Sequence, residues 1–555
     1  MMLIGAFLEA LGVGLMLPVM AAIMDEDIID KNDTIRVVSD FLGIASHREF
    51  VIISILSLVA VIIIKNVYLM VQYYIQYKFI YYNRYKAQQR LVANYINRPY
   101  EYFLYAASGD IVRVINEDVP ATYNLLGSVM AVATESVVSL ALILTVFIIS
   151  PAITLLTAAV LLLVSFIITR IAKPVLRKSG EGRSYYSGQM NKWILQAING
   201  IKEIKVSRTE TFFQDNFEKN GIEYVMAYRK NQIYQDLPRM VIEMMGICSV
   251  LLAMLVFILS GEDIVNLVPA FSAFAMAAVK ILPSANRIVN GIGAVSFSEK
   301  ALDSLLENLP NVDEEEKNIT QKNQKQLEDS FSFKKQISLD NITYHYPNVE
   351  KNILDNANCS IPIGSSIGII GPSGSGKTTT VDIILGLLKP QQGQVLCDGV
   401  DVSEHYDEWL SHIGYIPQMI FMLDDTIRAN VAFGQGNADN DDEAIWNAIE
   451  KAQLGDYVRG LPDGLDTQIG ERGIRVSGGQ RQRIGIARAL YTDPEILVFD
   501  EATSALDNET EAAIMESINA LHGTKTMIII AHRLTTIEEC DIVYKVENGK
   551  IEQVR

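Results

Sequence analysis

The stretch SIGIIGPSGSGKT, residues Ser366 to Thr378, decides the fold of the C-terminal half of this 555-residue chain. A short, largely apolar run suited to a buried strand leads into a loop with phosphate-binding spacing: Gly371, Pro372, Ser373, Gly374, Ser375, Gly376, Lys377 and Thr378. Glycines let backbone N–H groups curl around phosphate oxygens, the lysine charge reaches the β- and γ-phosphates, and the threonine hydroxyl can ligate Mg²⁺. Thr379 continues into an apolar helix, so this context predicts an α/β P-loop nucleotide-binding domain rather than an ordinary glycine-rich turn.

A second strand supplies acidic groups that suit the same chemistry. The run ILVFD, residues 496–500, is apolar up to Asp500, and Glu501 follows directly. A buried strand places Asp500 at its carboxyl end, where it can hold Mg²⁺ through water, and it places Glu501 to polarise an attacking water. An apolar strand followed by two acids is common by itself; together with the loop it indicates nucleotide hydrolysis.

Further segments fit a nucleotide site. Ser477, Gly478, Gly479 and Gln480 precede a helical stretch, and such a turn exposes N–H donors and a hydroxyl to a phosphate. Gln418 closes the strand-like run 413–417, and His532 ends another such run at 526–531. Tyr346 is either an aromatic that stacks on adenine or a strand-edge side chain.

The N-terminal half has a different composition. The chain is 49% hydrophobic with a net charge of −18, and its long apolar runs lie before about residue 290. Six membrane spans are predicted, at 1–24, 50–74, 124–149, 152–172, 240–260 and 264–290. The acidic balance argues against nucleic-acid binding, and the four scattered cysteines argue against disulfides or structural zinc.

The distribution of charged residues, and of the helix-breaking residues Gly and Pro, indicates the orientation and length of the predicted helices. The segments 78–113 and 173–239 are rich in Lys and Arg, which places them on the cytosolic side with the C-terminal half. Residues 51–98 contain no Gly or Pro, which favours one long helix over two shorter helices with a break near Tyr77. We therefore expect a six-helix transmembrane domain with cytosolic extensions at 1–305, a linker at 306–335 and the nucleotide-binding domain at 336–555.

Five ionisable residues fall inside the predicted spans: Glu9, Lys65, Glu135, Glu243 and Lys280. Inserting such a residue into the membrane at the centre of a helix costs about 2.5–3.5 kcal/mol, so each should face a cavity or a partner. One interpretation is a polar pathway. The other is that they form helix-holding Glu–Lys pairs or reach out to the membrane surface.

The ordered set of motifs resembles the ATP-binding cassette (ABC) exporters of the half-transporter type, over essentially the whole chain. The resemblance implies these roles: Tyr346 for adenine stacking, Gly371–Thr378 as Walker A, Ser477–Gln480 as the signature motif with Val476 replacing the usual leucine, Asp500 as the Walker B aspartate, Glu501 as the catalytic glutamate, Ser504–Asp507 as the D-loop and His532 as the switch histidine. Gln418 resembles the Q-loop glutamine, which contacts Mg²⁺ together with Thr378 and Asp500.

In such transporters each ATP is held between the Walker A loop of one cassette and the signature motif of another. This chain has one cassette, so the resemblance implies a homodimer, with a heterodimer as the alternative. ATP and Mg²⁺ are the implied cofactors, and a bacterial inner membrane is the implied location. The short segments Glu101–Ile111 and 207–217 are candidates for the helices that couple the two domains.

The substrate prediction depends on shorter matches. The segments FLEALGVG at 7–14 and KILPSANR at 280–287 are similar to segments of lipid-linked oligosaccharide flippases and of related polysaccharide-lipid exporters. Lys65, Lys280 and Arg287 could hold a pyrophosphate headgroup, or they could serve only as helix-packing residues. The alternatives are a peptide or hydrophobic-drug exporter and, less in keeping with an intact hydrolytic set, an ATP-gated channel or regulator.

Overall fold

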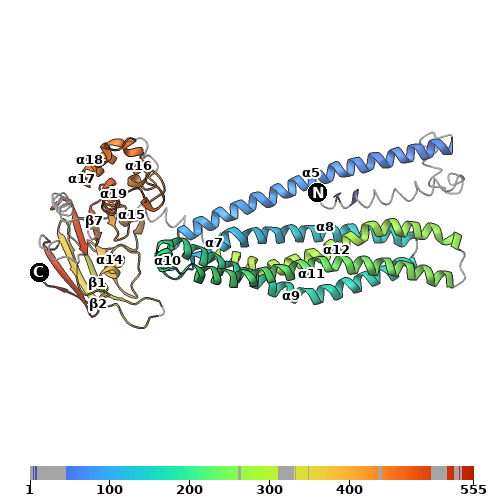
Figure 1. The fold of residues 1–555 in the computed structure, drawn as a ribbon, viewed down its shortest axis with the longest axis horizontal. Coiled ribbons are helices and arrows are strands. Elements are labelled where there is room, and N and C mark those ends of the chain that lie inside the picture. Colours follow the sequence, from blue (N-terminus) through green and yellow to red (C-terminus); the bar gives the residue numbers. More distant parts are fainter. Residues whose placement is uncertain are drawn as a thin grey trace. The chain divides into compact units, whose positions relative to one another are not determined.

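The computed structural model describes residues 4–5, 7–8, 46–149, 151–259, 264–309, 331, 333–347, 349–435, 441–501, 522–530, 537 and 540–555. The chain divides into two compact units (Figure 1). One comprises Met1–Arg98 and Tyr102–Glu315, and the other comprises Pro99–Glu101 and Glu316–Arg555. Each unit is described by itself below.

The first unit is helical. Its elements are α5 (His47–Ile96), α6 (Tyr100–Tyr105), α7 (Ser108–Arg113), the π-helical turn η1 (Val114–Asp118), α8 (Val119–Ile149), α9 (Pro151–Asn199), α10 (Ile201–Ser207), α11 (Glu210–Leu259) and α12 (Ile264–Asn308). The prediction of one long helix after residue 50 is confirmed, because α5 continues unbroken for 50 residues, or about 75 Å. The predicted span 1–24 lies outside the described residues, except for residues 4–5 and 7–8.

Length and composition identify membrane-crossing candidates within this unit. In the described part of the chain, three helical stretches are long and apolar enough to span a bilayer: His47–Ile96, Ser108–Leu144 and Ala158–Asn199. The other two predicted spans that can be compared, at 240–260 and 264–290, fall largely within α11 and α12.

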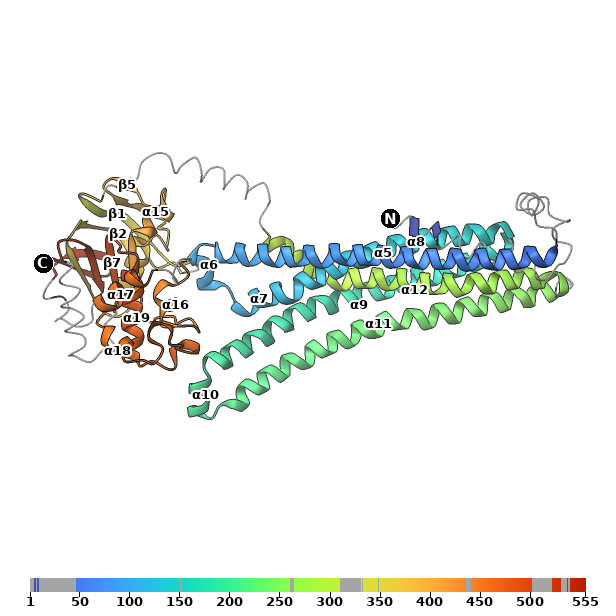
Figure 2. The ribbon, with the colours of Figure 1, turned by 90° about the horizontal axis from the view of Figure 1, so that it is seen from above.

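Close backbone approaches hold the long helices together. Helix α9 packs along α11 and α12, and α8 packs along α12, while Figure 2 shows the α9–α10–α11 hairpin diverging from α5 towards its α10 end. A Cβ on Gly180 of α9 would lie 1.9 Å from the carbonyl oxygen of Phe297 on α12, and one on Gly291 would lie 2.3 Å from Val132 Cγ2. Small residues at such crossings allow membrane helices to pack tightly.

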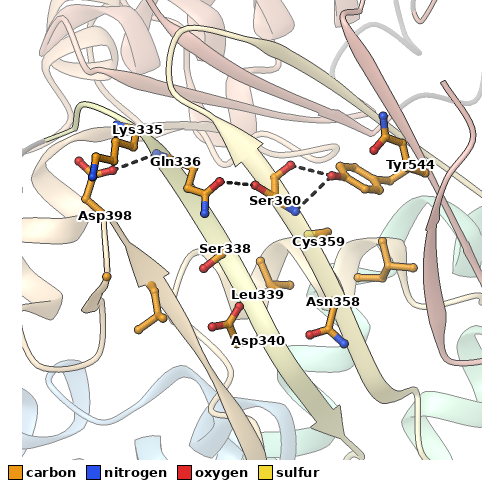
Figure 3. A pocket seen from close by; sticks show the side chains of 14 residues that line it. Lys335, Gln336, Ser338, Leu339, Asp340, Asn358, Cys359, Ser360, Asp398 and Tyr544 are labelled. Atoms are coloured by element: carbon orange, nitrogen blue, oxygen red, sulfur yellow. Dashed lines mark hydrogen bonds between the residues drawn. The ribbon is translucent and has the colours of Figure 1, made fainter.

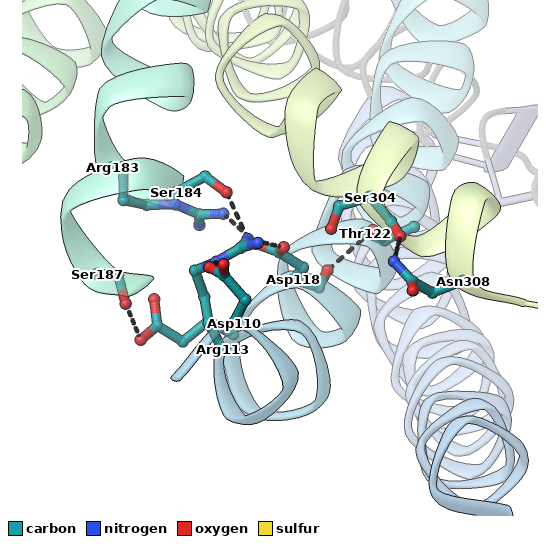
Figure 4. A network of polar contacts seen from close by, with 10 residues as sticks. Asp110, Arg113, Asp118, Thr122, Arg183, Ser184, Ser187, Ser304 and Asn308 are labelled. Atoms are coloured by element: carbon teal, nitrogen blue, oxygen red, sulfur yellow. Dashed lines mark hydrogen bonds and ion pairs between the residues drawn. The ribbon is translucent and has the colours of Figure 1, made fainter. Parts of the chain in front are cut away.

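A buried carboxylate links the π-helical turn to α9 and α12 (Figure 4). Asp118 is fully buried and forms ion pairs with Arg113 and with Arg183, whose Nη2 lies 3.3 Å from Asp118 Oδ1. Ser304 of α12 lies close to the Asp118 side chain. Because removing one member of a buried ion pair leaves the other charges uncompensated, this Asp118 cluster ties three segments together.

The second unit contains two sheets. The antiparallel sheet has the order β2 (Leu354–Pro362), β1 (Gln336–Tyr344), β4 (Gln392–Cys397), β5 (Val400–Asp401). The larger sheet has the order β10 (Lys550–Gln553), β9 (Ile542–Glu547), β3 (Ser366–Ile370), β8 (Thr526–Ile530), β7 (Ile496–Asp500), β6 (Ile413–Ile416). All its strand pairs are parallel except β10 with β9. The carboxyl ends of β3, β7 and β6 therefore meet at one edge.

Helices complete this α/β unit. They are α14 (Lys377–Ile384), α15 (Tyr406–Ser411), α16 (Ile427–Ala432), α17 (Asp442–Lys451), α18 (Gly455–Arg459) and α19 (Gly478–Tyr491), with 3₁₀ turns η3 (Gly464–Asp466) and η4 (Glu471–Gly473). Between α14 and α15, the fully buried Trp409 donates its indole N–H to the carbonyl oxygen of Ile384 at 3.0 Å. The fold is thus a helical membrane unit joined to an α/β nucleotide-binding unit, as the sequence predicts.

The contact of Gly180 with α12 predicts that Gly180→Ala destabilises the membrane unit, because a methyl group would collide with backbone that cannot rotate away. Overpacking of this kind costs about 1–3 kcal/mol. Thermal unfolding of the purified protein in detergent, followed by tryptophan fluorescence, should show a lower midpoint.

Gly182→Ala is the matched control, because a Cβ there meets Ala227 Cβ at an ordinary 3.9 Å. Alanine is favoured over glycine in a helix by about 1 kcal/mol, so its midpoint should be unchanged or higher. Equal midpoints for the two variants would contradict the close approach of α9 and α12.

Candidate nucleotide site

The glycine-rich loop connects the carboxyl end of β3 to α14. Gly371 has φ +153° and Gly376 has φ +103°, in a region that L side chains rarely adopt. A Cβ on Gly371 would lie 2.3 Å from the carbonyl oxygen of Val546, and one on Gly376 would lie 2.8 Å from Ile353 Cγ2. Glycine is thus required at both positions for this loop to turn tightly into the helix.

The polar groups of the loop have the properties of an anion site. The amine of Lys377 is largely buried and donates to the carbonyl oxygens of Gly371 and Pro372, at 3.0 Å each. The hydroxyl of Ser375 is buried and has no hydrogen-bond partner among the described residues. Thr378, in contrast, is exposed at the start of α14. A triphosphate would provide acceptors for the ammonium and hydroxyl groups, and an exposed threonine can reach a metal ion.

Tyr346 lies against the helix that follows the loop. Its phenolic oxygen is 3.1 Å from Thr379 Oγ1, and its ring meets the ring of Tyr344 edge-on with centroids 5.3 Å apart. The ring is half-buried. The structure therefore brings Tyr346 to the nucleotide loop, as an adenine-stacking residue requires, while its stacking role stays a prediction.

The acidic residues lie at the same edge of the sheet. Asp500 ends β7 and is only 6% exposed. Glu501 follows with φ +51°, which is uncommon for a residue of its type. Gln418, just beyond β6, donates its side-chain N–H to Glu501 Oε2 at 2.6 Å. Backbone strain of this kind clusters at functional sites, and here it directs the carboxylate of Glu501 to the Q-loop glutamine.

Burial changes the acidity of this edge. Burial, together with the negative charge of Glu501, raises the pKa of Asp500, while a hydrogen bond from Tyr415 and the positive charge of Lys377 lower it. Burial and the charge of Asp500 raise the pKa of Asp382, on α14, to about 6. Carboxylates crowded in a partly buried site suit a divalent cation, whose charge offsets their repulsion. Asp500 and Thr378 are the residues that would hold Mg²⁺.

The signature residues begin α19. Ser477 forms a capping box: Gln480 N donates to Ser477 Oγ at 3.2 Å, and Ser477 N donates to Gln480 Oε1 at 2.8 Å. Ser477 and Gly478 are exposed, and a Cβ on Gly478 would meet nothing within 4 Å. Within the described part of the chain, no hydrogen bond joins Ser477–Gln480 to residues 371–379. The exposed N-terminus of α19 can therefore contact a ligand that is bound outside this chain's own glycine-rich loop.

Some predicted residues cannot be placed. His532, Asp507 and the remainder of Ser504–Asp507 lie outside the described residues, as does Glu9. The helix at Lys280 is described, but its side chain is not.

The charges predicted within the spans separate into two kinds. Glu135 of α8, largely buried, pairs with Arg287 of α12 and accepts a hydrogen bond from Ser284 at 2.7 Å. Glu243 pairs with Arg239 one turn away on α11, at 3.0 Å. For Lys65, no ion pair is formed with another described residue. Glu135 therefore connects two helices, as the helix-holding interpretation predicts. A substrate anion that binds Arg287 would compete with the carboxylate of Glu135.

Sequence reasoning missed several residues around the site. Tyr415 lies close to Asp500 and helps to lower its pKa, and burial and the charge of Asp500 raise the pKa of Asp382. Tyr415 precedes Gln418 by three residues on β6, which pairs in parallel with β7. The position of Tyr415 on a strand that leads to Gln418 was the one available signal in the sequence. That signal points to Asp500 only when β6 is known to lie beside β7.

A groove on this unit is separate from these residues. Figure 3 shows a groove of about 700 Å³ over the antiparallel sheet. Its polar lining is paired within the fold: Tyr544 Oη donates to the carbonyl oxygen of Ser360 at 2.7 Å, and Ser360 Oγ donates to Gln336 Oε1 at 2.7 Å. None of the predicted nucleotide residues lines it.

Two family profiles match the chain. The profile described as ABC transporter transmembrane region matches residues 3–280. The profile described as ABC transporter matches residues 354–504. With half of the chain covered by the membrane profile and the motif geometry above, this chain belongs to the ABC transporter family. It is an exporter-type half-transporter, with one membrane domain and one ATP-binding domain.

Particular relatives add detail. The Nostoc sp. heterocyst differentiation ATP-binding protein HepA is 31% identical over 81% of this chain and 72% of that protein. The Methylobacillus flagellatus ATP-dependent lipid A-core flippase is 34% identical over 68% of this chain and 63% of that protein. A solved ATP-bound bacterial Atm1-family ABC exporter has the same fold, with a TM-score of 0.75 and 22% identity over 100% of this chain and 94% of that chain.

The buried lysine of the loop predicts that Lys377→Ala abolishes ATP binding, because no other described side chain brings an ammonium group into this loop. A fluorescent ATP analogue titrated against purified protein would measure it. Lys389→Ala is a control on the same unit, at an exposed position beyond α14. Unchanged affinity in Lys377→Ala would contradict the assignment of the loop.

The raised pKa of Asp382 predicts a pH-dependent stability difference. Because its folded pKa of about 6 exceeds the unfolded value of about 3.9, its stabilising contribution is complete below about pH 4 and is lost as the pH rises through about 6. Asp382→Asn mimics the protonated acid, so it should unfold at a higher temperature than the parent protein near neutral pH.

The measurement is the unfolding midpoint of both proteins without nucleotide, from about pH 4.5 to about pH 7.5. The difference should shrink as the pH falls. A difference that is the same throughout this range would show that the carboxyl group is not destabilised by burial.

Proposed function

We propose that two copies of this chain form an ATP-driven flippase, which hydrolyses Mg-ATP between its cassettes and moves an amphipathic, lipid-linked substrate across a bacterial inner membrane. The proposed substrate class is a lipid-linked oligosaccharide. The proposed domain limits are 1–305, 306–335 and 336–555.

One observation carries the dimer proposal. The start of α19 presents Ser477 and Gly478 to solvent, with open space around Gly478. An exposed helix N-terminus favours an anion, yet no hydrogen bond connects it with the chain's own loop among the described residues. The signature motif of a second copy would complete the site over each loop, and the intact Glu501 makes two equivalent sites the simplest arrangement.

Each residue then has a distinct task. Lys377 and the backbone of the loop neutralise and orient the triphosphate, while Thr378 and Asp500 hold Mg²⁺, which screens charge on the phosphates. Glu501 accepts a hydrogen bond from Gln418, so Gln418 can hold the carboxylate in place to orient the attacking water and take its proton. His532 and Asp507 are proposed to complete the site as the switch histidine and D-loop aspartate.

Closure of the dimer stores the free energy that drives transport. ATP contacts both cassettes only in the closed state, so it stabilises that state selectively. Loss of the γ-phosphate removes contacts that bridge the cassettes, and they separate. The candidate coupling segment 101–111 contains most of α6 and the start of α7, and the segment 207–217 covers the end of α10 and the start of α11. We propose that these two segments carry this motion.

The substrate proposal rests on relatives and charge. A relative is named a lipid A-core flippase, and a lipid-linked headgroup with phosphates needs cationic partners. Arg287 pairs with Glu135 and its side chain is 58% exposed, so we propose it as a cationic residue on the substrate path. Lys65, Lys280 and Glu9 are proposed to lie on the same path.

Glu501→Gln should bind ATP with normal affinity and remain as a closed dimer, because the water is no longer activated. ATPase activity in proteoliposomes should fall by about 10²–10⁴-fold, and size-exclusion chromatography with ATP should show a stable dimer. Normal turnover would refute the role of Glu501, and full activity in a protein that stays monomeric would refute the dimer.

Arg287→Gln should reduce flipping of a fluorescent lipid-linked oligosaccharide in proteoliposomes and raise the lipid concentration needed to stimulate ATPase activity. Arg177→Gln is the control, since Arg177 forms only exposed ion pairs with Glu181 and Glu299, which contribute little. Stimulation by a peptide or hydrophobic drug alone, with no response to the lipid, would favour the alternative substrate class. Ion conductance without vectorial transport would favour a channel.

A further inference from the structure

The segment that follows Gln418 folds into a compact turn around one buried amide. Asn430 of α16 is fully buried. Its Oδ1 accepts from the backbone N–H of Leu423 at 2.9 Å, and its Nδ2 donates to the carbonyl oxygens of Leu423 and Thr426 at 3.1 and 2.9 Å. A single side chain thus fixes the path of the chain from the Q-loop glutamine to α16.

Arg488 of α19 attaches this turn to the signature helix. Its Nε donates to the carbonyl oxygen of Asn430 at 2.8 Å, its Nη1 to that of Phe421 at 2.9 Å and its Nη2 to Asn430 Oδ1 at 3.2 Å. The guanidinium also lies over the ring of Phe433, 4.0 Å from the centroid. Burial lowers the pKa of Arg488 to about 10, so the group remains charged at neutral pH.

The same surfaces pack closely. A Cβ on Gly485, one turn before Arg488, would lie 2.3 Å from Ile420 Cδ1. A Cβ on Gly473, before α19, would lie 3.1 Å from Met422 Cγ. Because alternate residues of the turn press on glycines around α19, the turn cannot shift along the helix without losing both packing and hydrogen bonds.

From this geometry we propose that Arg488 is a positioning residue, which makes the Q-loop turn and the signature helix move as one body. The proposal rests on the proposed function and adds a regulation of the same site. Gln418 at one end of the body contacts Glu501. Ser477, 11 residues before Arg488 and about 16 Å along the helix, contacts the second nucleotide at the other end.

This arrangement links the two ATP sites of a dimer. A change at Gln418 when ATP and Mg²⁺ occupy one site shifts the backbone of Phe421, and Arg488 passes that shift to α19. The helix carries Ser477 towards or away from the nucleotide on the second copy. An arginine suits this task because its planar fork binds three acceptors at once, which a lysine cannot reproduce.

The test compares Arg488→Lys with Arg483→Lys. Arg483 lies on the same helix and donates to the carbonyl oxygen of Gln453 at 2.9 Å, with no contact to the Q-loop turn. We expect Arg488→Lys to retain ATP affinity and unfolding midpoint. Its kcat for ATP hydrolysis should fall about tenfold with little change in KM, and ATP should no longer close the dimer when Glu501→Gln is added. Arg483→Lys should behave as the parent protein.

A double-mutant cycle with Gln418→Ala separates positioning from simple stabilisation. If Arg488 acts through Gln418, the two losses of kcat should not add. Additive losses, a loss confined to the unfolding midpoint, or normal ATP-driven closure in Arg488→Lys would overturn the inference. If the parent protein itself fails to hydrolyse ATP, the proposed function fails instead.

Gly485→Ala provides a second route should Arg488→Lys not fold. Its methyl group would push Ile420 away from α19 while leaving the guanidinium in place. It should lower kcat and ATP-driven closure in the same direction, with unchanged affinity for a fluorescent ATP analogue. Normal kcat and closure in this variant would also overturn the inference.

Discussion

The parallel pairing of β3, β8 and β7 is the constraint on which the ATP-binding unit depends. It brings the loop with Lys377 and the carboxylate of Asp500 to one edge of the sheet, although more than a hundred residues separate them in the chain. The edge then concentrates one ammonium group and several carboxylates in a partly buried space. Such a balance is unfavourable when empty and favourable around a nucleotide and a divalent cation, which explains why the raised pKa values of Asp382 and Asp500 occur there.

The same geometry underlies the proposal that a second cassette completes the site. The loop provides donors for phosphates on one side, whereas the capped start of α19 presents its own donors to solvent. The fold thus divides one site into two halves on different surfaces. In the proposed dimer, each half must be rigid for ATP binding to drive motion, and the Asn430–Arg488 hydrogen bonds attach the turn after Gln418 to the helix that begins with the signature motif.

In the membrane unit, packing and polarity have complementary roles. Glycines allow α9 and α8 to approach α12 closely, which provides dispersion contacts where the hydrophobic effect between helices is weak. Ion pairs add directional links: buried Asp118 joins the π-helical turn to α7 and α9, and largely buried Glu135 joins α8 to α12. Mispairing leaves a charge unsatisfied, so these links favour one helix register.

Local signals are enough to predict several elements of this protein: the loop after β3, the acids after β7, the capped signature turn and one unbroken helix in α5. Contiguous residues carry the chemistry or periodicity in each case, so no knowledge of distant contacts is needed. Other features emerge only from the folded chain: Glu135 pairs with Arg287, Asp118 is enclosed by two arginines, and Arg488 binds the turn after Gln418. Those partners are far apart in sequence, and a lone polar residue in a helix has the same local pattern whether it meets a ligand, a neighbouring helix or water.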